Sequence, residues 1–243
     1  MPKTIMQLQN VSKRYGNRLI LNNVNLDIYQ GEILSIIGEN GSGKTTLLKM
    51  IIGFLHPDSG KILYNSIDIS NNQKAISKDF GFATQENSFY PNLTAKENLE
   101  YFGGLYNLSK QDIEYNIKII LNLVKLTDSQ DFLAKHLSTG MQRRLDIACS
   151  LINNPRILIL DEPTEDLDIF LRKEMLELVK KINARGTTII LTSHLLSEIE
   201  LVTDRIAILA NKTIAKIGSL STLKSLAKKR TLDEVFASLK KNG

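Results

Sequence analysis

The segment that most constrains the fold of this chain is Gly38-Glu39-Asn40-Gly41-Ser42-Gly43-Lys44-Thr45-Thr46. It matches the pattern G-x4-G-K-[ST], in which glycines allow backbone N–H groups to point inward at phosphate oxygens. The apolar residues 33–37 before it predict a buried strand, and residues 45–52 after it predict a helix. Lys44 and the helix N-terminus supply positive charge, and the Thr45 hydroxyl suits Mg²⁺. This strand–loop–helix unit predicts a binding site for a nucleoside triphosphate.

Length and composition exclude several classes of protein. The chain has 243 residues, of which 42% are hydrophobic, enough for one large domain with an inserted subdomain. No uncharged apolar run approaches the roughly 18 residues of a membrane helix, and no signal peptide opens the chain. We therefore expect a soluble protein made in the cytosol. The single Cys149 excludes a disulfide framework, and the net charge of +5 is too dispersed to indicate nucleic-acid binding.

Apolar periodicity separates sheet-forming from helical parts of the chain. Residues 5–11 and 19–28 alternate like strands, with a turn predicted at residues 12–17. A capping box from Thr94 to Glu97 begins a helical pattern that runs almost unbroken to Asn153. Further strands are predicted at residues 61–64, 80–83, 157–160, 187–192, 205–209 and 213–217, with a helix at 169–184. Strand–helix alternation with continuous apolar strands predicts a mostly parallel, buried sheet.

The predicted fold is α/β. We expect a P-loop NTPase with a mostly parallel central sheet, an N-terminal antiparallel β subdomain and an inserted all-helical subdomain. Its single domain of residues 1–243 divides into a nucleotide-binding core (1–88 and 154–219), a helical subdomain (89–153) and a C-terminal helical tail (220–243). A second capping box at residues 231–234 predicts a short helix in that tail.

Two carboxylates, Asp161 and Glu162, end the apolar strand at residues 157–160. Ligands of open parallel sheets lie at the carboxyl ends of the strands, so we expect this pair to face the phosphate loop. Neighbouring strand residues point to opposite sides, and the two acids should therefore have different roles. Asp161 suits the Mg²⁺ shell, and Glu162 suits activation of the attacking water. A solvated Asp-Glu turn before Pro163 is the alternative interpretation.

The order of the motifs resembles that of the ATP-binding cassette family. The phosphate loop is followed by a glutamine after a strand (Gln85), Leu-Ser-x-Gly at residues 137–140, the paired acids, and a histidine after a strand (His194). The resemblance covers nearly the whole chain. It implies an ATPase that uses ATP and Mg²⁺, whose signature motif lies in the helical subdomain.

The resemblance also implies a role for individual residues. Tyr15 is similar to the aromatic residue that stacks on adenine, and Gln85 to the residue that links Mg²⁺ to the helical insertion. His194 resembles the switch histidine that touches the γ-phosphate. Ser138 and Gly140 resemble the signature residues that contact the γ-phosphate of a nucleotide held by the opposite subunit. Taken singly, each of these residues also fits a structural role, and Ser138 is an ordinary helix-cap candidate.

The expected site residues fall into three sets. The catalytic residues are Lys44, Glu162 and His194, and the Mg²⁺ ligands are Thr45, Gln85 and Asp161. The ATP-binding residues are Tyr15, Gly38, Glu39, Asn40, Gly41, Ser42, Gly43, Lys44, Thr45, Thr46, Gln85, Ser138 and Gly140.

Two departures from the common family pattern stand beside the expected site. The signature has Thr139 and Met141 where relatives commonly have Gly and Gln. Glu165 and Asp166 stand where relatives usually carry small neutral residues, and we expect the two carboxylates to repel one another and the triphosphate weakly.

The resemblance implies an ATP-hydrolysing subunit that powers a separate membrane permease. It would act as a peripheral protein on the cytoplasmic side of the membrane, paired with a second ABC subunit in a homodimer or heterodimer, with no nucleic-acid partner. Residues 231–236 and 89–94 are similar to export-type cassettes. The alternative is a non-transport ABC ATPase that acts on nucleic acid, ribosomes or protein assembly. Substrate contacts would lie in the permease, so the sequence does not reveal the substrate.

The segment after Gln85 is the predicted docking site for the permease. We expect Phe89, Tyr90 and Pro91 to be exposed and to supply the apolar core of that interface. Packing of these aromatic residues within the helical insertion is the alternative.

Overall fold

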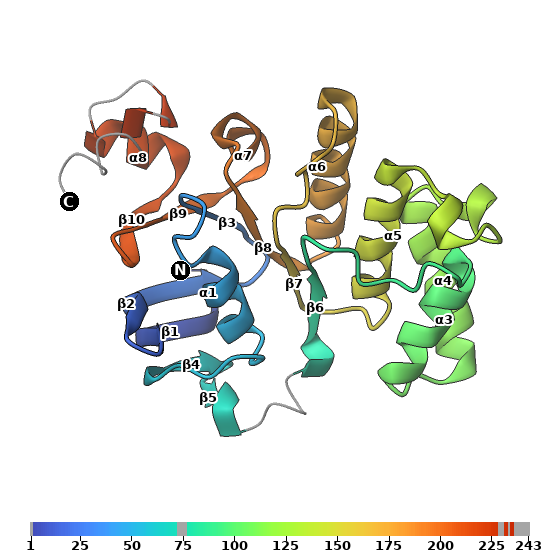
Figure 1. Ribbon diagram of the computed structural model, residues 1–243, viewed down its shortest axis with the longest axis horizontal. Helices are drawn as coiled ribbons and strands as arrows, with labels where there is room; N and C mark the ends of the chain where they lie inside the picture. Colours follow the sequence, from blue (N-terminus) through green and yellow to red (C-terminus); the bar gives the residue numbers. More distant parts are fainter. Residues whose placement is uncertain (1, 72–76, 228–230, 233, 236–243) are drawn as a thin grey trace. The chain divides into compact units, whose positions relative to one another are not determined.

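The computed structural model describes residues 2–71, 77–227, 231–232 and 234–235 (Figure 1). They belong to two compact units. The first unit comprises Met1–Ser77 and Thr188–Gly243, and the second comprises Lys78–Thr187. In the described part of the chain, no helix is both long and apolar enough to span a bilayer.

The first unit contains an antiparallel sheet with the strand order β2-β1-β4-β5. Its strands are β1 (Thr4–Tyr15), β2 (Arg18–Tyr29), β4 (Ser59–Tyr64) and β5 (Ile67–Asp68). Tyr15 pairs directly with Arg18, so the turn between the long strands is shorter than the predicted residues 12–17. Gly16 has a φ of 55° at this turn, which a glycine adopts without steric cost.

A second group of strands in the first unit surrounds β3. Its strands are β3 (Ile33–Ile37), β8 (Thr188–Ser193), β9 (Arg205–Ala210) and β10 (Thr213–Gly218). β3 pairs in parallel with β8 and β9, and β10 is antiparallel to β9. Every residue of β3 and β8 is buried, as is typical of parallel strands that are covered on both faces. Among the described residues, the α-helices of this unit include α1 (Lys44–Ile51), α7 (Leu196–Val202) and α8 (Leu220–Ala227).

A buried ion pair fixes the start of the central strands in the first unit. Glu32, which is 8% exposed, accepts hydrogen bonds from Arg205 Nη1 at 2.9 and 3.0 Å. Burial raises the pKa of Glu32, and its bonds to the Tyr29 N–H and to Arg205 act in the opposite direction. Glu32 precedes β3 and Arg205 begins β9, so the ion pair joins the starts of these two strands. The other end of β3 leads to the phosphate loop, and the other end of β9 leads to the turn before β10.

The second unit combines a parallel strand pair with a group of helices. β6 (Phe80–Ala83) pairs with β7 (Ile157–Leu160), and α6 (Ile169–Asn183) follows β7. The clustered helices are α3 (Ala95–Leu105), α4 (Lys110–Leu123) and α5 (Thr139–Leu151) (Figure 1). The capping box at the start of α3 is confirmed, because Thr94 Oγ1 accepts from Glu97 N at 3.1 Å and Glu97 Oε2 accepts from Thr94 N at 2.7 Å.

The predicted fold class is confirmed, and one local prediction is corrected. The helical pattern of residues 94–153 is broken after α3 and α4, where Asn107 and Lys125 have φ values of 56° and 58°. The two-residue strand β5 and the helix α7 were not expected from the sequence. In the tail, Glu234 N donates to Thr231 Oγ1 at 3.3 Å, and the rest of the predicted helix, including Asp233, lies outside the described residues. The domain boundaries expected from the sequence stay a prediction.

Candidate nucleotide site

The phosphate loop of the first unit joins β3 to α1. Gly41 and Gly43 have φ values of 77° and 106°, in the left-handed region that favours glycine. A Cβ on Gly38 would lie 2.6 Å from Ser42 Oγ and 2.7 Å from the Leu209 carbonyl oxygen, so no larger residue fits there. Gly43 is the N-cap of α1 and, among the described residues, no side chain caps this helix. The N-terminus of α1 is therefore open to an anion, as the sequence pattern predicts.

Lys44 is buried at the start of α1, with 7% of its surface exposed. Its ammonium donates to the carbonyl oxygens of Gly38 at 2.9 Å and Glu39 at 3.3 Å. These bonds hold the ammonium against the inside of the loop. Thr45 follows as an exposed residue, and Thr46 is half-buried. The loop thus presents one cation and a hydroxyl at its helix end.

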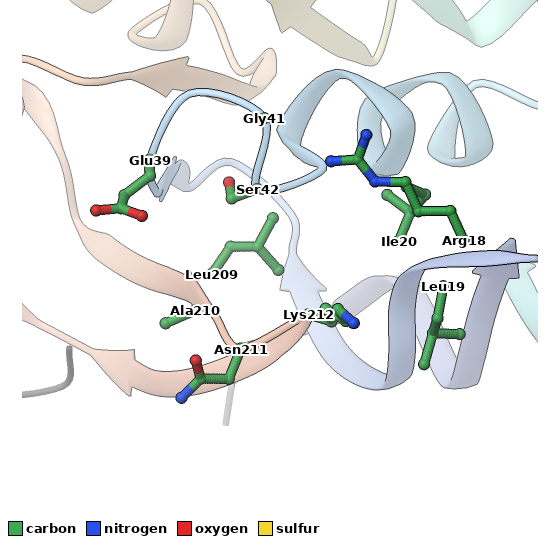
Figure 2. Close-up of a pocket in the computed structure, with 10 residues that line it drawn as sticks. All are labelled: Arg18, Leu19, Ile20, Glu39, Gly41, Ser42, Leu209, Ala210, Asn211 and Lys212. Atoms are coloured by element: carbon green, nitrogen blue, oxygen red, sulfur yellow. The ribbon is translucent and has the colours of Figure 1, made fainter. Parts of the chain in front are cut away.

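A pocket of about 410 Å³ lies beside the phosphate loop (Figure 2). The strand β2, the loop itself and the turn between β9 and β10 form its walls, through Arg18, Leu19, Ile20, Glu39, Gly41, Ser42, Leu209, Ala210, Asn211 and Lys212. Figure 2 shows the Ser42 hydroxyl on the loop above Leu209, with Glu39 and Arg18 toward opposite ends of the pocket. Asn40, another expected ligand, is exposed on the loop.

Tyr15 and His194 flank the loop region within the first unit. Tyr15 ends β1 and is 50% exposed. His194 is exposed and directly follows β8, whose last residue, Ser193, pairs with Ile37 at the end of β3. Parallel strands in register end at the same edge, and His194 therefore leaves the sheet at the edge where the phosphate loop begins.

Asp161 and Glu162 follow β7 in the second unit and are 3% and 8% exposed. Asp161 N donates to the Ala83 carbonyl at 3.0 Å, which extends the pairing of β6 and β7 by one residue. Glu162 has a φ of 51°, so its backbone is left-handed and not that of a continuing strand. The expected approach of both acids to the phosphate loop stays a prediction, because the loop belongs to the first unit.

Gln85 follows β6 at the same strand edge as Asp161, and its side chain is exposed. Gln85 Nε2 donates to Glu165 Oε2 at 2.5 Å. The expectation that Glu165 acts mainly as a repulsive charge is therefore incomplete, since its carboxylate holds the Gln85 amide. A carboxylate accepts only from the NH₂ end of the amide, which leaves the Gln85 carbonyl oxygen directed away from Glu165.

Ser138 is the N-cap of α5, and its Oγ accepts from Met141 N at 3.4 Å. The side chain is exposed, so it can serve as a helix cap and still meet a ligand. Gly140 is buried, and a Cβ there would lie 2.9 Å from Leu171 Cδ2 on α6. Packing against α6 is therefore a second reason for glycine at the signature motif.

The segment after Gln85 is only partly exposed. Phe89, expected to be on the surface, is 8% exposed, which corrects that prediction in favour of packing. Tyr90 is 46% exposed, and its ring meets Tyr101 of α3 edge to face at a centroid distance of 4.7 Å. The buried Asn98 fixes this segment, because its Nδ2 donates to the carbonyls of Tyr90 and Thr94 and its Oδ1 accepts from Tyr90 N.

Two buried charges of α5 were not assigned a role from the sequence. Arg143 and Asp146 are 7% and 1% exposed, and both bond to the segment that contains Gln85. The only sequence signal for them is the placement of charges, three residues apart, among apolar residues of a helix.

The expected Mg²⁺ ligands form a chemically suitable set. Thr45, Gln85 and Asp161 offer a hydroxyl, an amide oxygen and a carboxylate, which are the hard oxygen donors that Mg²⁺ prefers. Within the described ranges, no group of three or more His, Cys, Asp and Glu residues could hold a metal ion by itself.

Comparison with known proteins places these features in a family. A family model described as ABC transporter matches residues 21–165. Nod factor export ATP-binding protein I of Burkholderia lata is 36% identical over 209 residues, which cover 86% of this chain and 69% of that protein. Linearmycin resistance ATP-binding protein LnrL of Bacillus subtilis is 35% identical over 219 residues, which cover 90% and 70%.

Solved structures give the same result. The structure of an ATP-binding subunit of an ABC transporter has a TM-score of 0.87 and 28% identity, covering 98% of this chain and 100% of its own. The ATP-binding cassette MJ0796, in a dimeric post-hydrolysis state bound to ADP and Pi, has a TM-score of 0.78 and 31% identity, covering 88% and 98%.

Proposed function

Because the chain belongs to the ABC transporter family and is an ATPase of that family, we propose that it hydrolyses MgATP to power export through a separate membrane permease. The observation that carries this proposal is the similarity, over most of both chains, to export and resistance ATP-binding proteins. The chain works at the cytoplasmic face of the membrane as a peripheral subunit.

Nucleotide binding is the role of the first unit. The loop of residues 38–46 wraps the phosphates with its N–H groups, and Lys44 neutralises the β- and γ-phosphates. Support comes from the left-handed glycines and from the Lys44 ammonium, which the loop carbonyls already orient. Tyr15, which is half-exposed, stacks on the adenine. His194 contacts the γ-phosphate from the end of β8.

Hydrolysis is the role of the carboxylates in the second unit. Glu162 takes a proton from the attacking water, and its burial keeps this carboxylate from being surrounded by solvent. Thr45, Gln85 and Asp161 would hold Mg²⁺, and the bound ion would supply positive charge to the transferred phosphoryl group. Glu165 orients the Gln85 amide so that its oxygen is the end presented to the metal.

A head-to-tail dimer completes each site. Ser138 and Gly140 at the N-terminus of α5 approach the γ-phosphate bound by Lys44 of a second cassette subunit. The dimeric relative bound to ADP and Pi supports this arrangement. In a test, Ser138→Arg chains are mixed with Lys44→Ala chains. Some activity should return, because one composite site of the mixed dimer is intact, whereas inactivity of every mixture would contradict the shared site.

Tyr90 and Tyr101 form the proposed contact surface for the permease. Both rings are more than one-third exposed, and together they offer the aromatic core that interfaces favour. The double substitution Tyr90→Ser with Tyr101→Ser should release the protein from membranes and leave soluble ATPase activity intact. Tyr115→Ser is the matched control, since Tyr115 is an exposed tyrosine of α4.

The proposed function is tested most simply by isolating the natural complex. The tagged chain is purified from membranes in a mild detergent, and its partners are identified by mass spectrometry. A protein with several membrane-spanning helices should co-purify and should increase the ATPase rate. Recovery of only nucleic acid, ribosomes or soluble proteins would support the non-transport alternative instead.

A further inference from the structure

Helix α5 of the second unit carries two buried charges one turn apart. Arg143 and Asp146 are 7% and 1% exposed and lie among the buried residues Leu145 and Ile147. Burying a charged side chain is costly unless hydrogen bonds compensate for the lost water. If these two residues served only for packing, apolar side chains would give a more stable helix interface. The contacts of these two charges therefore indicate what they are for.

Arg143 bonds to the backbone of two separate segments. Nη1 donates to the carbonyl oxygens of Thr84 at 2.7 Å and Gln85 at 3.0 Å. Nη2 donates to the Glu162 carbonyl at 2.8 Å, and Nε donates to the Pro163 carbonyl at 3.2 Å. All four acceptors are carbonyls, so the planar guanidinium connects the chain after β6 to the chain after β7 with fixed geometry.

Asp146 adds a second anchor on the same segment. Its Oδ1 accepts from Ser88 N at 2.7 Å, three residues beyond Gln85. The segment is thus held at two points: Arg143 binds the Gln85 carbonyl, and Asp146 binds the Ser88 N–H. Burial lowers the pKa of Arg143, and the nearby carboxylate of Asp146 opposes that shift and favours the charged guanidinium.

Arg143 also supports an unfavourable backbone conformation. Glu162 has a φ of 51°, in the left-handed region that is unfavourable for a residue other than glycine. Its carbonyl is fixed by Arg143 Nη2 and by Glu165 N at 3.2 Å. Loss of the guanidinium would remove one of these two bonds and allow the Glu162 backbone to relax.

We propose that Arg143 is a positioning residue for ATP hydrolysis. The guanidinium attaches the backbones of Gln85 and Glu162 to the signature helix α5. It thereby fixes the position of the metal-binding amide relative to the catalytic carboxylate. The inference rests on the proposed roles of those two residues. It assigns to Arg143 an effect mainly on turnover, because none of the four carbonyls that the guanidinium holds belongs to the phosphate loop.

Arg143→Lys is compared with Arg144→Lys, the same substitution at the next position of α5. Arg144 donates to the Val124 carbonyl at 3.1 Å and to Glu174 Oε2 at 2.5 Å. A lysine at position 144 can still pair with Glu174. A lysine at position 143 has one donor group and cannot reach both backbone segments.

The expected results are a kcat at least about tenfold lower in Arg143→Lys, an ATP Kd within about twofold of wild type, and a wild-type kcat in Arg144→Lys. The assays are run well below the unfolding temperature of each variant. Equal kcat values for both variants and wild type would overturn the proposal, as would a loss in kcat that only follows the unfolded fraction.

A double-mutant cycle separates positioning from general stabilisation. If Arg143 acts through Gln85, Arg143→Lys should reduce kcat by a smaller factor in a Gln85→Ala background than in wild type. An equal reduction of kcat in both backgrounds would contradict an action of Arg143 through Gln85. Should Arg143→Lys fail to fold, Arg143→Gln and Arg144→Gln are compared by the same criteria, because the neutral amide avoids an unpaired buried charge.

The proposed function can fail independently of this inference. Full activity in Glu162→Gln would remove the assigned base whatever Arg143 does. An inactive Glu162→Gln together with unchanged kcat in Arg143→Lys would contradict the positioning role alone.

Discussion

The phosphate loop of the first unit and the carboxylate region of the second are built by different means. The loop is shaped by its own backbone, with left-handed Gly41 and Gly43 and a Lys44 ammonium bonded to loop carbonyls. The carboxylate region is held by a side chain from a distant helix, since Arg143 bonds to the carbonyl of Glu162. A binding loop can thus be encoded in one contiguous stretch, whereas the hydrolytic region requires a buried charge from another element.

Glu162→Gln is expected to have the largest effect, because it removes the proposed base without changing the shape of the side chain. Turnover should fall about 100-fold or more, while ATP affinity should stay at the wild-type value. Steady-state phosphate release and equilibrium ATP binding measure the two quantities. A variant that keeps near-normal turnover would break the assignment of hydrolysis to the second unit.

Substitutions of Tyr15 test the binding region with a smaller expected effect. Stacking of a base on an aromatic ring is worth about 1–3 kcal/mol, so Tyr15→Ala should lose ATP affinity by that amount. Tyr15→Phe is the matched control, because it keeps the ring and should bind ATP almost normally. Isothermal titration calorimetry measures both, and equal affinities of the two variants would exclude stacking.

Much of the fold and of the binding loop can be predicted from the sequence because those features are local. The apolar runs at β3, β6 and β7 match the observed strands residue for residue. The phosphate loop requires glycine where the backbone is left-handed or where neighbouring atoms leave no room for a Cβ. A short sequence pattern is enough to show those glycines.

The missed features of the carboxylate region depend on residues far apart in the chain. Arg143 bonds to Thr84, which is 59 residues away, and Gln85 bonds to Glu165, which is 80 residues away. The local pattern does not show which distant residues these side chains contact. The predicted exposure of Phe89 failed for the same reason, since its burial depends on tertiary packing.

The buried charge of Asp146 makes stability depend on pH. Burial raises the pKa of its carboxyl from 3.8 to about 6, against the bond from Ser88 and the charge of Arg143. The folded state therefore keeps a proton that the unfolded chain has lost between about pH 4 and pH 6. Because of this group, the free energy of unfolding should fall as pH rises through that window and then level off.

Asp146→Asn should remove this contribution, because it keeps the acceptor for Ser88 N without a titrating group. Relative to wild type, the variant should gain roughly 1–2 kcal/mol between pH 4 and pH 7. Urea unfolding at the two pH values measures the difference, and other carboxylates cancel in the comparison. Parallel pH profiles for the two proteins would show that folding does not raise the pKa of Asp146.

Glu165→Gln is expected to have the smallest effect. It weakens the charged acceptor of the Gln85 amide, and the amide should then turn more freely at the Mg²⁺ site. The Mg²⁺ concentration for half-maximal ATPase activity should rise severalfold, by less than about tenfold. Asp166→Asn is the control for removing one negative charge at the neighbouring position. An equal shift in both variants would indicate general electrostatics in place of a specific bond.

We propose separate roles for two residues: Lys44 of the first unit holds the nucleotide, and Glu162 of the second is the base for its hydrolysis. Wild type, Glu162→Gln and Lys44→Ala are each incubated with labelled MgATP, and the bound nucleotide is recovered by rapid filtration and identified by chromatography. The account predicts intact ATP on Glu162→Gln at wild-type affinity, and at least about tenfold weaker retention by Lys44→Ala. ADP formed on Glu162→Gln at the wild-type rate, or undiminished retention by Lys44→Ala, would contradict it.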